Sequence, residues 1–282
     1  MSALSSNVKG IGLGLRQPIA DALLERLPKE ISWVEVHPEN YVERGGRFPH
    51  VLGRAREHWP VVTHGLTLGL GSVSPFEREY VQTLKKFLHE VETPWHSEHL
   101  CVTGVDDVMF HDLIPIPLTR AAARIAIQRL RELRDAVEKP IALENITFYA
   151  EPGKSGMDEA SFVLDVLDGA DALLLLDVNN IYVNAKNFGF DPRAYLDRIP
   201  KERVAQIHIA GHLIQPDGLR IDTHGEAICE DVFSLLEYTL ARLGEVPVLL
   251  ERDGNYPSLD VLVEELRRLT EIYERATSVK VL

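Results

Sequence analysis

The sequence has few cysteines. Only two of its 282 residues are cysteine, Cys101 and Cys229, and they lie far apart without forming a C-x-x-C unit. A C-x-x-C redox or metal motif is therefore excluded. Two isolated cysteines are typical of a reducing compartment, where we expect them to pack as small apolar residues.

Basic runs and long apolar runs are also missing. The formal net charge is -13 and no basic run interrupts it, which opposes binding to the phosphate backbone of nucleic acids. The N-terminus lacks the basic region and apolar run of a signal peptide, and no apolar run is long enough to span a membrane. We therefore expect a cytoplasmic protein that binds neither nucleic acid nor a membrane.

The chain has no low-complexity segment and no linker-like change in composition. With 45% hydrophobic and 26% charged residues, it has an ordinary globular composition. Its length permits two small domains, but one large barrel also reaches this size. We expect a single domain over residues 1–282.

Short apolar strands alternate with amphipathic helical segments along the whole chain. The expected strands are Ile11–Leu15, Trp33–His37, Val61–His64, Trp95–Leu100, Ile141–Glu144, Leu173–Asp177, Val204–Ile209 and Val248–Glu251. The expected helices are Pro18–Leu27, Val51–His58, Pro75–Val91, Thr119–Glu138, Asp158–Leu167, Pro192–Arg198, Ala227–Leu243 and Ser258–Thr277.

Eight such units predict an α/β fold, the TIM (β/α)8 barrel, because strands that are apolar on both faces form a parallel sheet covered by helices. A doubly wound open sheet is the alternative. It is disfavoured because Gly10, Gly12 and Gly14 alternate inside a strand and lack the later glycine of a phosphate-binding turn.

Polar side chains stand at nearly every strand end, and in a barrel the C-terminal strand ends carry the site. In chain order they are Glu35, His37, Glu39, Asn40, His64, His96, Glu98, His99, Glu144, Asn145, Asp177, Asn179, Asn180, His208, Glu251, Arg252 and Asp253, with Asp222 and His224 in the loop after the seventh strand. Each alone is more often a cap or a satisfied polar group, and Asp222 would suit the N-cap of a helix from about Ala227. His96 is expected to pack, since it can face away from His99 along its strand.

Gathered on one rim, these groups favour a metal site. Burying so many carboxylates without cations would be very costly. Imidazole and carboxylate together suit zinc, iron or manganese.

The motifs, taken together, resemble the multinuclear non-haem iron-dependent oxidative enzymes (MNIO family), in order and over nearly the whole chain. They are G-L-G-L-R, E-V-H-P-E-N-Y, H-G-L, S-E-H-L, L-E-N, L-D-V-N-N, I-H-I-A-G-H, D-T-H-G-E and L-L-E-R-D-G-N. The form is most similar to the branch that matures bufferins, small copper-handling peptides, and more distantly to the oxidase of methanobactin synthesis. The resemblance implies a TIM barrel related to xylose isomerase and endonuclease IV.

The resemblance also implies two or three irons, in mixed Fe(II)/Fe(III) states, in the barrel mouth. The first iron site maps onto His64, His99 and a bridging Glu144. The second maps onto Glu144, Asp177, His208 and Glu251. The third maps onto Asn180, Asp222 and His224, where the amide of Asn180 replaces a histidine of the endonuclease branch and is a weaker ligand.

The implied activity is oxidation of cysteine residues in a ribosomally made precursor peptide, with O2 as co-substrate and a thiooxazole or related product. Glu144 and Asp253 are the catalytic candidates, Asp253 as a proton acceptor. The candidates for substrate contact are His37, Asn145, Asn179 and Arg252, of which the last three could instead orient ligands. A separate protein that recognises the leader of the precursor is the expected partner.

Three other classes of function stay open at this point. An endonuclease IV-type metal-dependent phosphodiesterase nearly fits the ligand set, although the acidic charge opposes it. A metal-dependent sugar isomerase should carry a lysine or histidine base on the rim, and no lysine stands at an expected strand end. A non-catalytic metal-binding scaffold is the remaining alternative.

Overall fold

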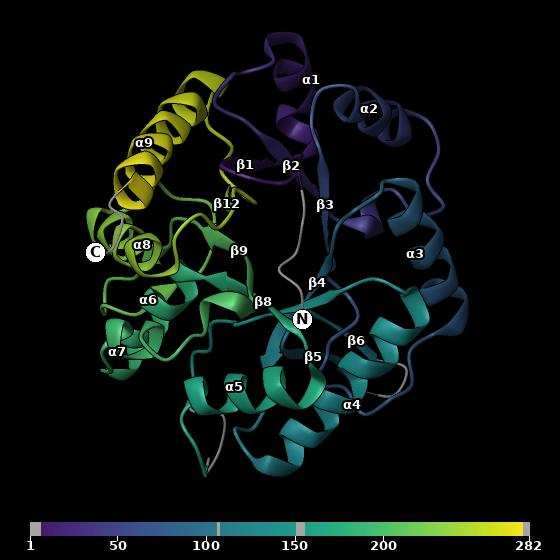
Figure 1. Cartoon of the computed structure of the whole chain (residues 1–282), viewed down its shortest axis with the longest axis vertical. Helices are drawn as coiled ribbons and strands as arrows, with labels where there is room; N and C mark the ends of the chain where they lie inside the picture. The colour runs from purple at the N-terminus through teal and green to yellow at the C-terminus, as the bar shows by residue number, and fades with distance from the viewer. Residues whose placement is uncertain (1–6, 106–107, 151–155, 279–282) are drawn as a thin grey trace.

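Eight parallel strands close into a barrel in the computed structural model, which describes residues 7–105, 108–150 and 156–278 (Figure 1). Around the barrel the order is β1-β12-β9-β8-β7-β4-β3-β2, and β2 pairs with β1 to close it. The strands are β1 (Ile11–Gly14), β2 (Trp33–Val36), β3 (Val61–His64), β4 (His96–His99), β7 (Ile141–Glu144), β8 (Leu173–Asp177), β9 (Val204–Ile209) and β12 (Val248–Leu250). The predicted TIM barrel is confirmed, with all eight strands in the predicted places.

The helices form a layer outside the strands, as Figure 1 shows. They are α1 (Gln17–Arg26), α2 (Arg47–Arg56), α3 (Arg78–Glu90), α4 (Arg120–Val137), α5 (Glu159–Ala170), α6 (Val178–Phe188), α7 (Pro192–Leu196), α8 (Glu230–Leu243) and α9 (Leu259–Ser278), with the short 3-10 turns η1 (Pro38–Asn40) and η2 (Lys201–Arg203). In the part of the chain that the structure describes, no helix is both long and apolar enough to cross a membrane.

Several element boundaries differ from the prediction. Helix α3 begins at Arg78 and not at Pro75, because the Glu77 side chain accepts hydrogen bonds from the backbone N–H groups of Glu79 and Tyr80 and so caps the helix. Helix α8 begins at Glu230 and not at Ala227. Asp222 is therefore no cap of this helix, because the N-cap position belongs to Cys229.

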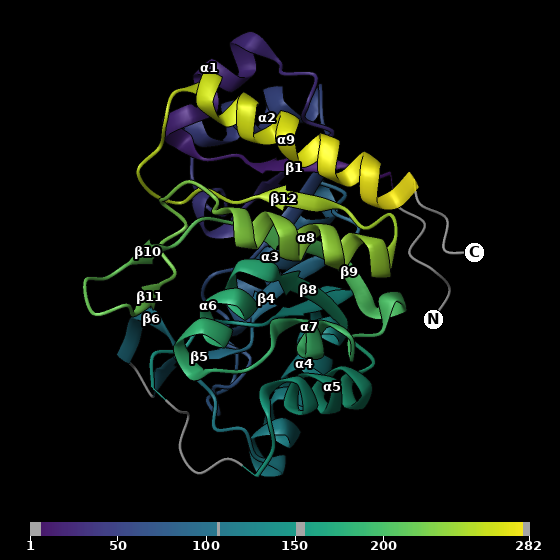
Figure 2. The same cartoon turned by 90° about the vertical axis from the view of Figure 1, so that its left-hand side faces the viewer.

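Helix α6 and two hairpins were not predicted. The hairpins are β5 (Cys101–Val105) with β6 (Val108–Pro115), which follow β4, and β10 (Leu213–Ile214) with β11 (Arg220–Ile221), which follow β9. Both therefore leave the C-terminal ends of barrel strands, and Figure 2 shows them on the same side of the molecule. They extend the rim on which the predicted site lies.

The barrel interior has an apolar layer below a polar one. Its apolar cluster contains Trp33, Val62, Trp95, Ala142, Leu173, Leu175 and Leu249. Gly12 makes room for this cluster, since a Cβ at Gly12 would lie 2.4 Å from the Trp33 ring. Side chains two residues apart share one face of a strand, so each strand that contributes an apolar residue here points a later polar residue into the mouth above it.

Candidate metal centre

Strand alternation places the polar residues above the apolar cluster. Trp33 is followed two residues later by Glu35, Val62 by His64, and Trp95 by Ser97 and then His99. On the other side of the barrel Ala142 is followed by Glu144, Leu175 by Asp177 and Leu249 by Glu251. All these polar side chains are buried. These side chains thus form the upper layer of the barrel core, at or just after the C-terminal ends of the strands.

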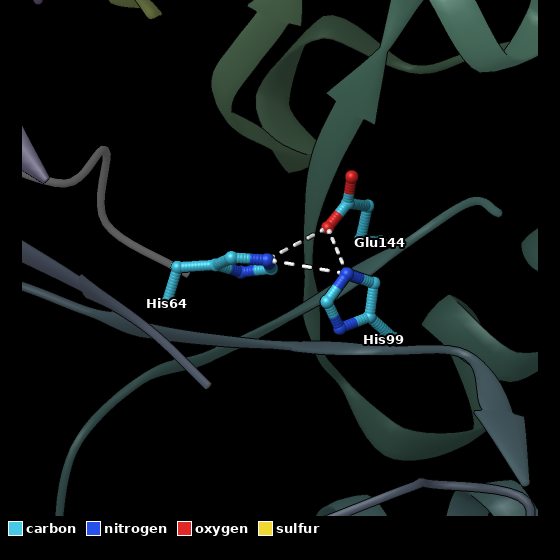
Figure 3. A group of neighbouring side chains, drawn as sticks. All are labelled: His64, His99 and Glu144. Carbon is cyan, nitrogen blue, oxygen red and sulfur yellow. Dashed lines mark hydrogen bonds and ion pairs between the residues drawn. The ribbon is translucent and has the colours of Figure 1, made fainter. Parts of the chain in front are cut away.

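His64, His99 and Glu144 form the first group that could hold a metal ion (Figure 3). Their facing atoms make a nearly equilateral triangle: His64 Nε2 lies 3.3 Å from His99 Nε2 and 3.2 Å from Glu144 Oε2, and His99 Nε2 lies 3.3 Å from Glu144 Oε2. Donor atoms that share one ion at about 2.1 Å lie roughly 3.0–3.4 Å apart. The triangle therefore has the dimensions of a metal site.

The hydrogen bonds of His64 leave its facing nitrogen free. The Ser97 hydroxyl donates its one proton to the backbone carbonyl of Thr63, at 3.3 Å. Its oxygen then accepts from Nδ1–H of His64, at 2.9 Å, and Nε2 keeps a lone pair. Burial lowers the pKa of His64 well below its usual range and that of His99 to about 4, so both rings are neutral, the form that binds metals.

Glu144, Asp177, His208 and Glu251 form the second group. His208 Nδ1 lies 2.9 Å from Glu251 Oε2 and 3.8 Å from Glu144 Oε1. Glu144 thus offers Oε2 to the first group and Oε1 to the second. Burial raises the pKa of Glu144 well above its usual range and that of Asp177 to about 7, which is the expected cost of crowding carboxylates without cations.

The third group consists of His224, Glu251 and Asp253. His224 Nδ1 lies 3.2 Å from Glu251 Oε2 and 3.6 Å from Asp253 Oδ2. Asp222, a member of the predicted third set, contacts the other ring nitrogen of His224: its Oδ1 lies 2.7 Å from His224 Nε2. His224 has φ 47, a left-handed conformation that is uncommon outside glycine and that turns this ring into the mouth.

Unpartnered buried atoms mark where an ion would fit. Among the described residues, those without a hydrogen-bond partner include Glu144 Oε2, Asp177 Oδ2 and Asn180 Oδ1. Orphaned buried acceptors are costly unless a cation or donor meets them. The predicted ligand Asn180 donates its amide N–H to the backbone carbonyl of Asn145, at 3.0 Å, which leaves Oδ1 free. The donor set is nitrogen and oxygen, which suits iron, zinc or manganese.

Arg16 joins this cluster and was missed in the sequence. Its Nε lies 2.6 Å from Asp253 Oδ1, and its Nη2 lies 3.5 Å from Glu251 and 3.8 Å from Glu35. Gly14 permits this, because a Cβ there would lie 2.9 Å from the Arg16 guanidinium carbon. Burial would raise the pKa of Asp253, but Arg16 and His224 hold it well below its usual range. The signal was present in G-L-G-L-R, where two inward glycines precede the arginine.

All four candidates for substrate contact hold the backbone or other side chains. Asn145 exchanges two hydrogen bonds of 3.0 Å with the backbone of Asp177. Asn179 donates to Asp222 at 2.7 Å and accepts from Nδ1–H of His212 at 2.8 Å. Arg252 pairs with both carboxylate oxygens of Glu265 in α9, at 2.9 and 2.7 Å.

The fourth candidate, His37, lies beside the first group. Its Nδ1–H donates to the backbone carbonyl of His64 at 2.9 Å, and the two rings are 5.6 Å apart. All four side chains are buried. Their contacts favour a role in orienting neighbouring groups. Direct contact of these side chains with substrate stays a prediction.

His96 lies outside the three groups. It contacts Glu98 at 3.1 Å and Thr63 at 3.1 Å, on the opposite face of β4 from His99. The expectation that it packs away from His99 agrees with this geometry.

Comparisons with known proteins identify the family. A family model described as "RiPP precursor modification enzyme MbnB/TglH/ChrH" matches residues 10–274. This chain belongs to that family. Its relatives include UPF0276 proteins of Pseudomonas aeruginosa (40% identical over 270 residues, covering 95% of this chain and 94% of the relative) and Acinetobacter baylyi (41% over 260 residues, covering 92% and 90%). The MbnB/TglH/ChrH family consists of enzymes that modify precursor peptides, so this chain is an enzyme with a peptide substrate.

Solved structures support the fold of this family member. D-psicose 3-epimerase from Clostridium cellulolyticum H10 aligns with a TM-score of 0.65 at 10% identity, over 95% of this chain and 99% of that one. A xylose isomerase domain protein from Planctomyces limnophilus aligns with a TM-score of 0.61 at 13% identity, over 97% and 99%. The xylose isomerase-like barrel is therefore confirmed.

Proposed function

We propose that this protein is a multinuclear iron-dependent oxidase that uses O2 to modify cysteine residues of a ribosomally made precursor peptide. The observation that carries the proposal is the sharing of carboxylates between groups. Glu144 belongs to the first and second groups, and Glu251 to the second and third. Shared carboxylates are how neighbouring ions are held at a short fixed spacing.

Iron bound there would supply a ligand position for the cysteine thiolate and electrons for the reduction of O2. His64, His99 and Glu144 would hold one ion, and Glu144, Asp177, His208 and Glu251 the next. Two or three irons would match the number of groups, and we propose the mixed Fe(II)/Fe(III) states that the family resemblance implies. A third ion would be held by His224 together with Asp222, Asn180 or Asp253.

The chain's own residues provide the proton acceptor. Asp253 is the carboxylate of the mouth that Arg16 keeps ionised, and its side chain is 37% exposed. It can therefore meet a substrate from outside while Arg16 fixes its orientation. Glu144 has no comparable exposure and would act as the bridge.

The substrate we propose is a cysteine-containing precursor of the bufferin type, with a thiooxazole or related product. The support is the family's description as precursor-modifying enzymes together with the motifs of the chain. We also propose that a separate protein presents the leader of the precursor and that the reaction takes place in the cytoplasm; the support for a presented peptide is the family's description as precursor-modifying enzymes.

The test is turnover of a precursor encoded beside this gene. Iron-loaded protein, with and without the neighbouring gene product, is incubated with the full-length precursor in air, and peptide mass and O2 uptake are followed. We expect a mass change confined to cysteine residues, with matching O2 uptake. A zinc- or manganese-loaded protein that isomerises sugars or cleaves a phosphodiester, with no O2 uptake, would overturn the proposal.

A further inference from the structure

His208 of the second group is held from below by a buried carboxylate. Its Nδ1 faces Glu251 and Glu144, while its other nitrogen, Nε2, lies 3.0 Å from Glu35 Oε2. His208 and Glu35 have no exposed surface. Glu35 belongs to none of the three groups that could hold an ion.

Two further buried residues fix Glu35. The indole N–H of Trp95 donates to Gln206 Oε1 at 2.8 Å. Since an indole can only donate, this contact identifies the oxygen of the Gln206 amide and turns its nitrogen the other way. That nitrogen donates to Glu35 Oε2 at 2.7 Å.

The two donors converge on one oxygen. Gln206 Nε2 and His208 Nε2 lie 2.8 Å apart, each within 3.0 Å of Glu35 Oε2. An imidazole that binds an ion through Nδ1 carries its proton on Nε2. The N–H groups of His208 and Gln206 then point at the same place, and a negatively charged acceptor between them is required. A carboxylate provides it, and a neutral amide at position 35 would not.

We propose that Glu35, held by Gln206 and through it by Trp95, is a positioning residue that fixes His208 to bind the second ion through Nδ1. Partners of metal-binding histidines of this kind set the ring orientation and raise its basicity. The inference deepens the proposed function, since it rests on metal binding at the second group, but it does not depend on the reaction or its substrate.

The test measures Fe2+ binding to the metal-free full-length protein, without oxygen, by calorimetry and by metal stoichiometry. Glu35→Gln should weaken binding at the second group about 10- to 100-fold, the range typical of such partners, and leave the first ion bound. Glu35→Asp keeps the charge but withdraws the carboxylate, so it should also weaken binding. Glu98→Gln is the matched control, because Glu98 is an equally buried carboxylate bonded to His96, outside the groups.

A second readout reports the histidine directly. In Zn2+-loaded wild-type protein with ¹⁵N-labelled histidine, NMR should show His208 protonated at Nε2, and Trp95→Phe should perturb that signal while keeping most of the core. Should Glu35→Gln fail to fold, Glu35→Asp and Trp95→Phe carry the test, and both must weaken the second ion.

The outcomes separate this inference from the proposed function. Wild-type affinity in Glu35→Gln, an unimpaired Glu35→Asp or an equal loss in Glu98→Gln would each overturn the positioning role. Wild-type protein that binds no Fe2+ would instead remove the proposed function.

Discussion

Asp177 has a separate task for each of its carboxylate oxygens. Oδ1 accepts the backbone N–H of Asn180 at 2.6 Å and caps helix α6, while Oδ2 is buried without a hydrogen-bond partner. From the sequence, a cap and a metal ligand were competing explanations for such a residue. Here one residue fits both, because a strand that runs directly into a helix places the cap in the barrel mouth.

Two substitutions at Asp177 should separate these tasks. Asp177→Asn keeps an oxygen for the cap but loses the charge, so metal content should fall while thermal stability of the metal-free protein is unchanged or higher. Asp177→Ala should lose metal and, in addition, the cap, which is worth about 1 kcal/mol. Metal analysis and denaturant unfolding check this, and equal metal content in all three proteins would contradict it.

The shared position of Glu144 predicts unequal effects of ligand removal. His99→Ala should cost the first ion only, and Glu144→Ala should cost both, because each of its oxygens faces a different group. Plasma emission analysis of protein purified without chelator, with circular dichroism as the fold control, gives the stoichiometry. Normal metal content in Glu144→Ala would exclude the bridge.

At the scale of elements, the barrel could be predicted because apolar strands and amphipathic helices alternate without interruption. Helix α6 could not, since Asp177-Val178-Asn179-Asn180 follows the strand without a turn and resembles a polar loop. The hairpin β5–β6 was not predicted because its sequence was interpreted as a loop that connects a barrel strand to the following helix. The polar strand ends were predicted from position alone, but Arg16 required knowing that Gly14 faces inward.

Gly12, one of the two inward glycines of β1, gives an element-scale prediction. Gly12→Ala places a Cβ 2.4 Å from the Trp33 ring inside a packed core, so the free energy of unfolding should fall by about 1–3 kcal/mol. Gly53→Ala in helix α2 is the control, since no atom lies within 4 Å of its Cβ and alanine favours helix. Urea unfolding should show opposite signs for the two variants, and a stable Gly12→Ala would refute the packing.

For the whole molecule, the buried charges make stability depend on pH in opposite ways with and without metal. Burial raises the folded pKa of Asp177 to about 7 and raises that of Glu144 well above its usual range. Burial would lower the pKa of both His208 and His224. The carboxylates of Glu251 and Glu35 instead raise the pKa of His208 well above its usual range. Those of Asp222 and Glu251 do the same for His224. Groups with raised folded pKa values stabilise the protein while protonated and lose that contribution as pH rises through the folded pKa.

The metal-free protein should therefore become less stable over a window that begins at about pH 6.5, where the histidines of the unfolded chain lose their protons. Below that window His64 and His99 oppose the trend, because their lowered pKa values favour folding as pH rises toward 6.5. With metal bound the trend should reverse, since an ion displaces the protons and binds more tightly at higher pH. Thermal unfolding across this range checks both signs, and identical pH profiles with and without metal would contradict the account.

The central claim is that two ions share Glu144, and anomalous X-ray scattering tests it most directly. Crystals of protein purified in air without chelator would be measured on both sides of the iron absorption edge. The account predicts one iron peak among His64, His99 and Glu144 and a second among Glu144, Asp177, His208 and Glu251. A mouth without peaks, or a single peak that does not contact Glu144, would contradict it.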